Sequence, residues 1–195
     1  MNAMDFVKEN VVFYLVNAEN NKEMLSNIPH RHFFDLSIVY RVVIDVDTDG
    51  MRSFIVDNNT MTMIGITEGE LFSLSKKNTR RLLPSTTINM NDMLKIENSD
   101  NEIPMIVISN SFSLYGAATI LYEDVLYNIA EGMGEDLYLL PSSIHEFIVV
   151  PSTIGDKDSL MYIIKMVNNE VVKENERLSD NVYYYDMETK MITQL

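Results

Sequence analysis

The chain has 195 residues, 46% of them hydrophobic and 23% charged, which is typical of a globular protein with one hydrophobic core. Its 29 acidic and 15 basic residues give a formal net charge of −14. This charge disfavours binding of nucleic acid, because a polyanion is normally held by a basic surface. The absence of cysteine excludes disulfides, thiolate metal sites and a cysteine nucleophile. The first residues show no signal-peptide pattern, so we expect a cytoplasmic protein without a membrane anchor.

The first half of the chain begins with a predicted helix and continues with a predicted β-hairpin. The helix is indicated by apolar residues at helical spacing, namely Met4, Val7, Val11 and Leu15. From Phe34 to Val46 every even-numbered residue is apolar, and a period of two over this length predicts a β-strand. Residues 47–50 (Asp-Thr-Asp-Gly) supply turn chemistry, and Met51 to Val56 follows as the partner strand.

A second helix is predicted from residue 67 onward. Thr67 and Glu70 fit a capping box, in which two side chains satisfy each other's backbone amides at the start of a helix. The basic cluster 76–81 (Lys-Lys-Asn-Thr-Arg-Arg) follows, and Pro84 comes where such a helix should stop. We interpret the cluster as cations at the negative end of the helix dipole. The alternative is a small patch for nucleic acid.

The rest of the chain alternates short apolar strands with single helices. Apolar stripes at helical spacing predict helices over residues 125–133, with Gly134 as the C-cap, and over residues 160–167. Strands are predicted at Met105–Ile108, Ala117–Leu121, Leu137–Leu140, Phe147–Val150, Val182–Tyr185 and Met191–Thr193. Short links between successive strands favour antiparallel pairing. We therefore expect an α+β fold, with three to four helices packed on a largely antiparallel sheet, in a single domain spanning residues 1–195.

Four short motifs carry a resemblance to a known family. They are Pro29 to Leu36 running on to Tyr40-Arg41, Gly116-Ala117-Ala118, Leu140 to Glu146, and Leu178-Ser179-Asp180. With them the chain resembles an uncharacterised bacterial domain-of-unknown-function family, seen in Gram-positive gut bacteria and often beside mobile-element genes. The resemblance covers most of the chain and implies an additional N-terminal region in longer relatives. The motifs have no assigned chemistry, so the resemblance implies no activity.

The candidate metal ligands are the three histidines, His30, His32 and His145. On a strand His30 and His32 would share one face, but His145 and the adjacent Glu146 would point to opposite faces. Their spacing matches no established zinc motif. We therefore interpret His30 and His32 as the rim of a loop that enters the long strand, and we expect no bound metal and no other cofactor.

The most enzyme-like residues lie in one short segment, Ser-Ser-Ile-His-Glu. A hydrolase would use Ser142 or Ser143 as nucleophile, His145 as base and an acid such as Asp180 as orienter. No Gly-x-Ser-x-Gly pattern surrounds either serine, and the seven glycines form no phosphate-binding loop. We expect Ser143 to be structural. On a strand it would stand too far from His145 for a hydrogen bond, and in a helical turn it would form a capping box with Glu146.

Two hypotheses of function follow from these patterns. The favoured one is a non-enzymatic interaction module that binds a protein or peptide partner, with a link to mobile elements or host defence. The run Tyr183–Tyr185 would suit such a surface, although we interpret it as aromatic pairing within a sheet. The alternative is a hydrolase or metal-dependent enzyme built on His145 with Ser143 and Glu146, and on the Arg41 face of the long strand. An enzyme requires these groups to converge in one pocket.

Overall fold

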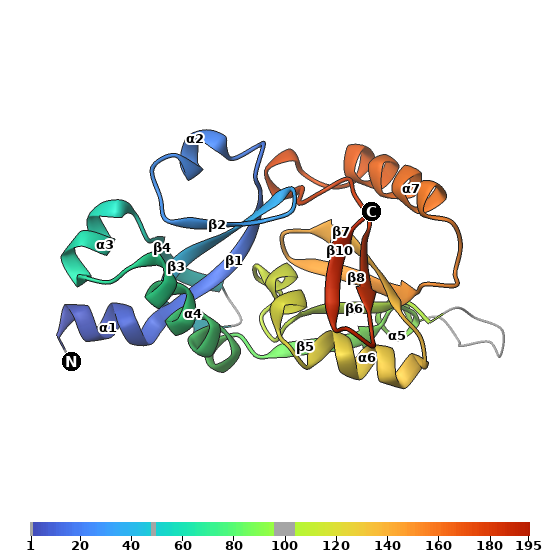
Figure 1. Cartoon of the computed structure of the whole chain (residues 1–195), viewed down its shortest axis with the longest axis horizontal. Helices are drawn as coiled ribbons and strands as arrows, with labels where there is room; N and C mark the ends of the chain where they lie inside the picture. Colours follow the sequence, from blue (N-terminus) through green and yellow to red (C-terminus); the bar gives the residue numbers. More distant parts are fainter. Residues whose placement is uncertain (1, 48–49, 96–103) are drawn as a thin grey trace.

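The structure is a computed structural model that describes residues 2–47, 50–95 and 104–195. It is α+β with antiparallel pairing, as predicted, but its strands form two sheets that lie next to each other (Figure 1). Seven α-helices and two 3₁₀-helices occur within the described ranges, more than the three or four expected. The additional helices include three of only four to seven residues, which are too short to produce a visible period in the sequence.

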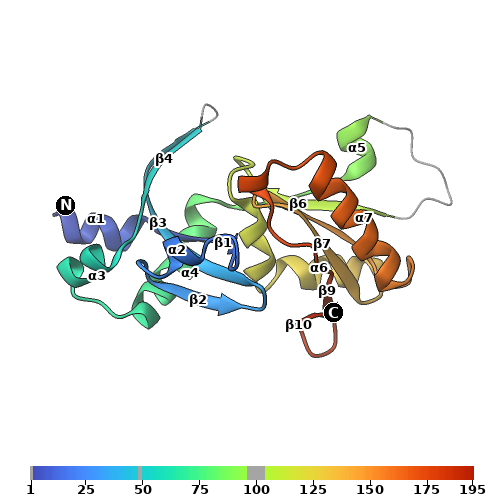
Figure 2. The same cartoon turned by 90° about the horizontal axis from the view of Figure 1, so that it is seen from above.

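The first sheet has four strands and is built around β3. Its elements are α1 (Ala3–Asn10), β1 (Val11–Asn17), α2 (Lys22–Leu25), β2 (His30–Phe33), β3 (Leu36–Asp47), β4 (Gly50–Ile55), α3 (Asn58–Ile64) and α4 (Glu68–Leu82). Strand β1 pairs with one side of β3, while β2 and then β4 pair with the other side. The predicted hairpin is therefore confirmed, with its turn residues 48–49 outside the described residues. Figure 2 shows the far ends of β3 and β4 projecting from the body of the molecule.

The second sheet has six strands in the order β10-β9-β7-β8-β6-β5. Its elements are β5 (Ser85–Asn89), α5 (Met90–Leu94), β6 (Ile106–Asn110), η1 (Gly116–Leu121), α6 (Val125–Met133), β7 (Leu137–Ser143), β8 (Glu146–Pro151), α7 (Lys157–Glu170), η2 (Glu174–Glu176), β9 (Tyr183–Asp186) and β10 (Met191–Gln194). Helices α6 and α7 cover opposite faces of this sheet (Figure 1). Successive residues of a strand point to opposite faces, and accordingly Leu139 and Leu140 belong to separate clusters of buried side chains.

Two local predictions were wrong. The apolar spacing from Met4 to Leu15 predicted one continuous helix, but α1 ends at Asn10 and a strand follows. The segment Val11–Val16 is buried at every position and consists of β-branched, aromatic and leucine residues, which suits a strand covered on both faces. Residues 117–121 were predicted as a strand and form part of the 3₁₀-helix η1, which is packed between the sheets. A short apolar run does not distinguish a buried strand from a buried helical turn.

The helix caps agree with the sequence predictions. Thr67 and Glu70 form both hydrogen bonds of a capping box at the start of α4. Gly134 has the left-handed conformation that ends α6. The basic cluster 76–81 lies in the last turns of α4, as predicted, and two of its members pair with carboxylates, Lys76 with Glu123 and Arg80 with Asp124.

One cluster of buried side chains contains residues of both sheets, among them Phe13 and Tyr40 from the first and Phe147 and Tyr183 from the second. Whether residues 1–195 unfold as one domain stays a prediction.

Across the described ranges, every helix is too short or too polar to traverse a lipid bilayer.

The turn between β2 and β3 joins the two halves of the molecule. Phe34 occupies this turn with φ +57° and its ring lies 5.9 Å from the ring of Tyr183. The Asp35 carboxylate accepts hydrogen bonds from the Ser179 hydroxyl at 2.6 Å, the Asn181 side-chain amide at 3.0 Å and the Tyr183 hydroxyl. Ser179 and Asn181 lie just before β9 and Tyr183 is its first residue, so this one carboxylate links the first sheet to the second.

Helix α4 is attached to the first sheet by a second polar cluster. Arg31 donates two hydrogen bonds to the Glu68 carboxylate, at 3.2 Å and 2.8 Å, and the hydroxyl of Tyr40 donates a third. The Arg31 guanidinium also lies 4.1 Å from the centre of the Phe72 ring. Burial tends to raise the pKa of Glu68, but the hydrogen bonds from Arg31 and Tyr40 outweigh it and hold the pKa below its ordinary value.

We predict that Asp35→Ala lowers the free energy of unfolding by about 2–3 kcal/mol, because three donors lose a charged acceptor. Asp45→Ala is the matched control. Asp45 is paired with Arg52 on the exposed hairpin, so its loss should change stability by less than about 0.5 kcal/mol. Urea unfolding of both variants measures the difference, and equal stability of the two would contradict the role given to Asp35.

We also predict that the contribution of Glu68 is lost in acid. Its pKa is lower in the folded protein, so the stabilisation is complete well above the ordinary glutamate pKa of about 4.3 and disappears as the pH falls through the folded-state value. Both Glu68 and Arg31 are partly exposed, which limits the effect to about 1 kcal/mol. Melting temperatures of the wild type and Glu68→Gln should therefore differ at pH 7 and converge near pH 3. A constant difference would contradict this assignment.

Candidate functional site

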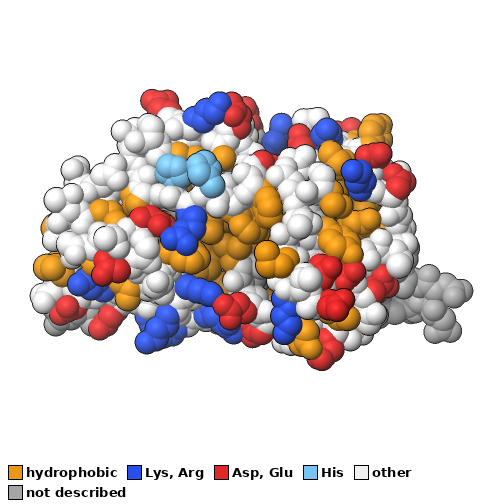
Figure 3. All heavy atoms as spheres, in the orientation of Figure 1, with side chains coloured by type: hydrophobic (Ala, Val, Ile, Leu, Met, Phe, Trp, Pro, Cys, Tyr) orange, Lys and Arg blue, Asp and Glu red, His pale blue; other side chains and the backbone are white. Residues whose placement is uncertain are grey.

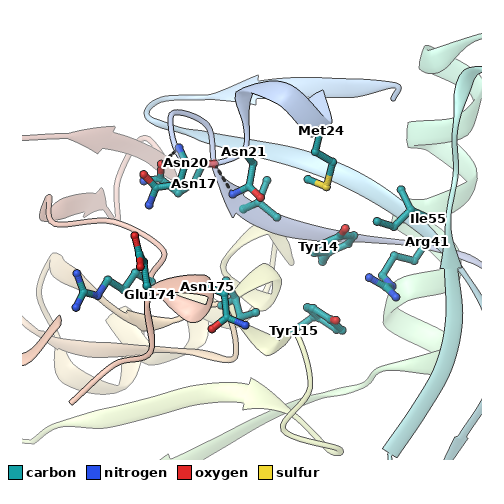
Figure 4. Close-up of a pocket in the computed structure, with 13 residues that line it drawn as sticks. Tyr14, Asn17, Asn20, Asn21, Met24, Arg41, Ile55, Tyr115, Glu174 and Asn175 are labelled. Atoms are coloured by element: carbon teal, nitrogen blue, oxygen red, sulfur yellow. Dashed lines mark hydrogen bonds between the residues drawn. The ribbon is translucent and has the colours of Figure 1, made fainter. Parts of the chain in front are cut away.

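A pocket of about 730 Å³ opens between the two sheets (Figure 4). One wall comes from β1, the loop after it, β3 and β4, and the other from the loop before η1, the β7–β8 turn and η2. The lining residues are Tyr14, Val16, Asn17, Asn20, Asn21, Met24, Arg41, Ile55, Tyr115, Ile144, Glu174, Asn175 and Arg177. The pocket is therefore assembled from segments that lie far apart in the sequence.

Tyr115 is held in place by an unusually constrained loop. It has φ +55°, a left-handed conformation that residues other than glycine rarely adopt. Its backbone N–H donates to Nδ1 of His145 at 3.2 Å. The next residue is Gly116, where a Cβ atom would come within 2.1 Å of Ser109 Oγ and 2.5 Å of the His145 carbonyl oxygen. Backbone strain of this kind persists where the surroundings fix it, and it is frequent at functional sites.

Arg41 lies at one end of the pocket between two tyrosine rings. Its guanidinium carbon is 5.4 Å from the ring centre of Tyr14 and 5.1 Å from that of Tyr115, and its Nε donates to Ser53 Oγ at 2.8 Å. The side chain is partly buried, yet no carboxylate of the described residues is within ion-pair distance of it. Burial raises the pKa of Tyr14, although Arg41 opposes this. Tyr14 therefore stays neutral beside the cation.

The opposite end of the pocket is polar and partly acidic. Asn17 is fixed there, because its side chain accepts from the Asn20 amide and donates to the Leu178 carbonyl. Four residues of this end, Asn17, Asn20, Glu174 and Arg177, also line an adjoining hollow of about 420 Å³, where Asp180 lies. We call the two hollows together the groove. Figure 4 shows Arg41 and the two tyrosines toward one end of the pocket, and Asn17, Asn20 and Glu174 toward the other end.

The enzyme-like segment forms the tight turn between β7 and β8, which is neither the straight strand nor the helical turn considered from the sequence. Ser143 Oγ accepts from the backbone N–H of His145 at 3.1 Å, and Ser142 Oγ donates to the Glu146 carboxylate at 3.2 Å. Nδ1 of His145 accepts from Tyr115. Within the described residues no hydrogen bond joins the Ser143 hydroxyl to the imidazole of His145.

His145 and Arg41 both lie near the ring of Tyr115. The His145 ring centre is 5.9 Å from that of Tyr115, whose ring in turn lies against the Arg41 guanidinium. Asp180 is in the adjoining hollow, where its carboxylate accepts from Asn168. The structure thus places Arg41 in the pocket, and His145 behind the pocket wall as the acceptor that positions Tyr115.

His30 and His32 lie together on the outer strand β2, with ring centres 5.6 Å apart. Figure 3 shows two neighbouring histidine side chains exposed on this face of the molecule. His145 belongs to the other sheet and does not join them. Over residues 2–47, 50–95 and 104–195, no three side chains of histidine, cysteine, aspartate or glutamate are grouped to hold a metal ion.

Sequence reasoning did not find Tyr14, Tyr115 and Arg177. Tyr14 fell within the segment that was predicted as a helix, outside its apolar stripe, and Arg177 had no pattern around it. A signal for Tyr115 was present, because it directly precedes the Gly116-Ala117-Ala118 motif. All four motifs noted in the sequence lie at the groove or at the Asp35 turn beside it. Arg41 and Ile144, each from one motif, line the groove, and so do residues 178–180. Gly116 adjoins the groove because it follows Tyr115.

The chain belongs to a family described as a family of unknown function (DUF5688), whose model matches residues 1–187. The resemblance to a family of unknown function is thereby confirmed. Comparison with curated proteins and with solved structures gave no match.

We predict that Gly116→Ala destabilises the protein by about 2–3 kcal/mol or more, because the added methyl group overlaps Ser109 and two backbone atoms. Gly132→Ala in α6 is the control. A Cβ there meets nothing within 4 Å, and alanine should stabilise the helix by up to about 1 kcal/mol. Thermal unfolding of both variants checks the prediction, which fails if Gly116→Ala is as stable as the wild type.

Proposed function

We propose that this DUF5688 protein is a non-enzymatic binding module that holds a peptide segment of a partner protein in the groove between its two sheets. The observation that carries the proposal is Arg41, a partly buried cation without an ion-pair partner among the described residues, held between Tyr14 and Tyr115. Pre-positioned aromatic and arginine side chains are typical of the residues that dominate binding energy at interfaces.

The shape and lining of the groove favour a peptide over a compact ligand. Its two hollows, of about 730 and 420 Å³, adjoin along four shared residues, so a ligand that occupies both has to be extended. The side-chain amides of Asn20 and Asn175 offer donors and acceptors for peptide groups, while Met24 and Ile55 offer apolar contacts. An extended chain presents both kinds of group in alternation.

The remaining candidate residues support binding over catalysis. Ser143 accepts a hydrogen bond within the β7–β8 turn, Glu146 accepts from Ser142, and His145 positions Tyr115. A hydrolase or metal-dependent enzyme built on these residues would have to release them from these contacts. The net charge of −14 also disfavours nucleic acid as the partner. We propose the cytoplasm as the location, in keeping with a cysteine-free sequence.

We predict that selection from a phage-displayed library of random peptides yields peptides that bind the purified protein with micromolar affinity. Tyr115→Ala should weaken their binding by about tenfold or more, because it removes one aromatic face and one support of Arg41. Tyr162→Ala is the control, since Tyr162 is 72% exposed on α7 and does not line the groove.

Fluorescence polarisation with the selected peptides measures these affinities. The proposal is wrong if no peptide is enriched, or if the enriched peptides bind Tyr115→Ala as well as the wild type. Loss of binding in Tyr162→Ala alone would place the binding surface on α7 instead of the groove, and would equally contradict it.

A further inference from the structure

We infer that the groove recognises its ligand through a carboxylate bound at Arg41, so that the ligand is a peptide carrying either a free C-terminal carboxylate or an acidic side chain at that point. This inference rests on the proposed function and adds the chemistry of recognition.

Arg41 has more binding capacity than its contacts use. A guanidinium has five N–H donors in a planar fork that matches a carboxylate. Within the described residues, the Arg41 side chain bonds Ser53 and lies against the rings of Tyr14 and Tyr115, but it meets no carboxylate. In a chain with 29 acidic and 15 basic residues, a partly buried cation without an acidic neighbour indicates a site kept for an external anion.

The contacts around Arg41 fix its orientation before any ligand binds. Ser53 holds Nε from the neighbouring strand, and the two rings flank the guanidinium. Tyr115 is itself fixed by His145 and by the tight packing at Gly116. Because the side chain is already ordered, little conformational entropy remains to be lost when an anion binds. Burial also strengthens the attraction, since the local dielectric constant is lower than that of water.

The distribution of charge along the groove favours one carboxylate over a phosphate or a polyanion. Arg41 is at one end. Toward the other end the lining carboxylates, which are Glu19, Asp35, Glu174 and Asp180, outnumber the one lining cation, Arg177. A second negative charge on the ligand would approach these carboxylates and be repelled. A basic group at that position would be attracted. The expected ligand therefore has its carboxylate at the Arg41 end and a neutral or basic residue farther along.

The test compares peptides that differ only in a carboxylate. Each selected peptide is made with a C-terminal acid and with a C-terminal amide, and separately with each Asp or Glu replaced by Asn or Gln. We expect one of these replacements to weaken binding to the wild type by about tenfold or more, because it removes a charge-assisted hydrogen bond. The replacement that has this effect identifies the source of the carboxylate.

Arg41→Gln is the diagnostic variant, with Arg52→Gln as control because Arg52 lies on the exposed hairpin. In Arg41→Gln the critical replacement should change affinity by less than about twofold, as expected for two groups that interact directly. In Arg52→Gln it should keep its full effect. Equal sensitivity in Arg41→Gln and the wild type would overturn the inference, as would peptides in which no carboxylate matters. In both cases the proposed function would stand.

A second measurement on the wild-type protein does not depend on the fold of a variant. Arginine Nε–Hε resonances are followed by NMR during titration with acetate and with inorganic phosphate. A saturable shift of the Arg41 resonance with acetate, and a weaker one with phosphate, supports the inference, whereas tighter binding of phosphate overturns it. If no peptide is selected but acetate shifts Arg41, the proposed function fails and the carboxylate site at Arg41 remains.

Discussion

The Asp35 carboxylate is the interaction on which the arrangement of the two sheets depends. It lies at the tip of the β2–β3 turn and accepts hydrogen bonds from Ser179, Asn181 and Tyr183. Burial, together with the bond to Asp35, raises the pKa of Tyr183, so its hydroxyl stays protonated and remains a donor. Strand β3 carries Arg41, and the segment before β9 carries Arg177. The hydrogen bonds to Asp35 therefore help to set the separation between the two walls of the groove.

The groove is positioned by residues that do not line it. Gly116 allows the close approach of Ser109 and the β7–β8 turn, and His145 accepts the backbone hydrogen bond that sets Tyr115. Tyr115 and Tyr14 then flank Arg41. His145, a catalytic candidate in the sequence, thus accepts the hydrogen bond that positions Tyr115, a residue of the proposed binding site. The contacts of Gly116 and His145 also compensate for the strained backbone conformation of Tyr115.

In the proposed recognition, the acidity of the chain would give Arg41 its selectivity. A net charge of −14 repels polyanions at long range, while a single carboxylate can reach one partly buried cation whose donors are free of protein carboxylates. The excess of acidic over basic residues at the other end of the groove would give such a ligand a preferred direction. Recognition in this scheme comes from a charge pattern along the groove more than from its volume.

The sequence by itself determined the features that depend on neighbouring residues. The β3–β4 hairpin, the Thr67–Glu70 capping box and the Gly134 cap follow from alternation, spacing and backbone freedom within a few positions. The order of the predicted strands and helices likewise determined the α+β class, and composition determined the unfavourable charge for nucleic acid. Strand β1 was not predicted because its burial on both faces removes the alternation of a strand. The 3₁₀-helix η1 was not predicted because a short apolar run looks the same in a strand. Only the tertiary structure decided the two-sheet division and the groove, because Tyr14, Arg41, Tyr115 and Arg177 come from distant segments that line one pocket, and no local periodicity encodes that.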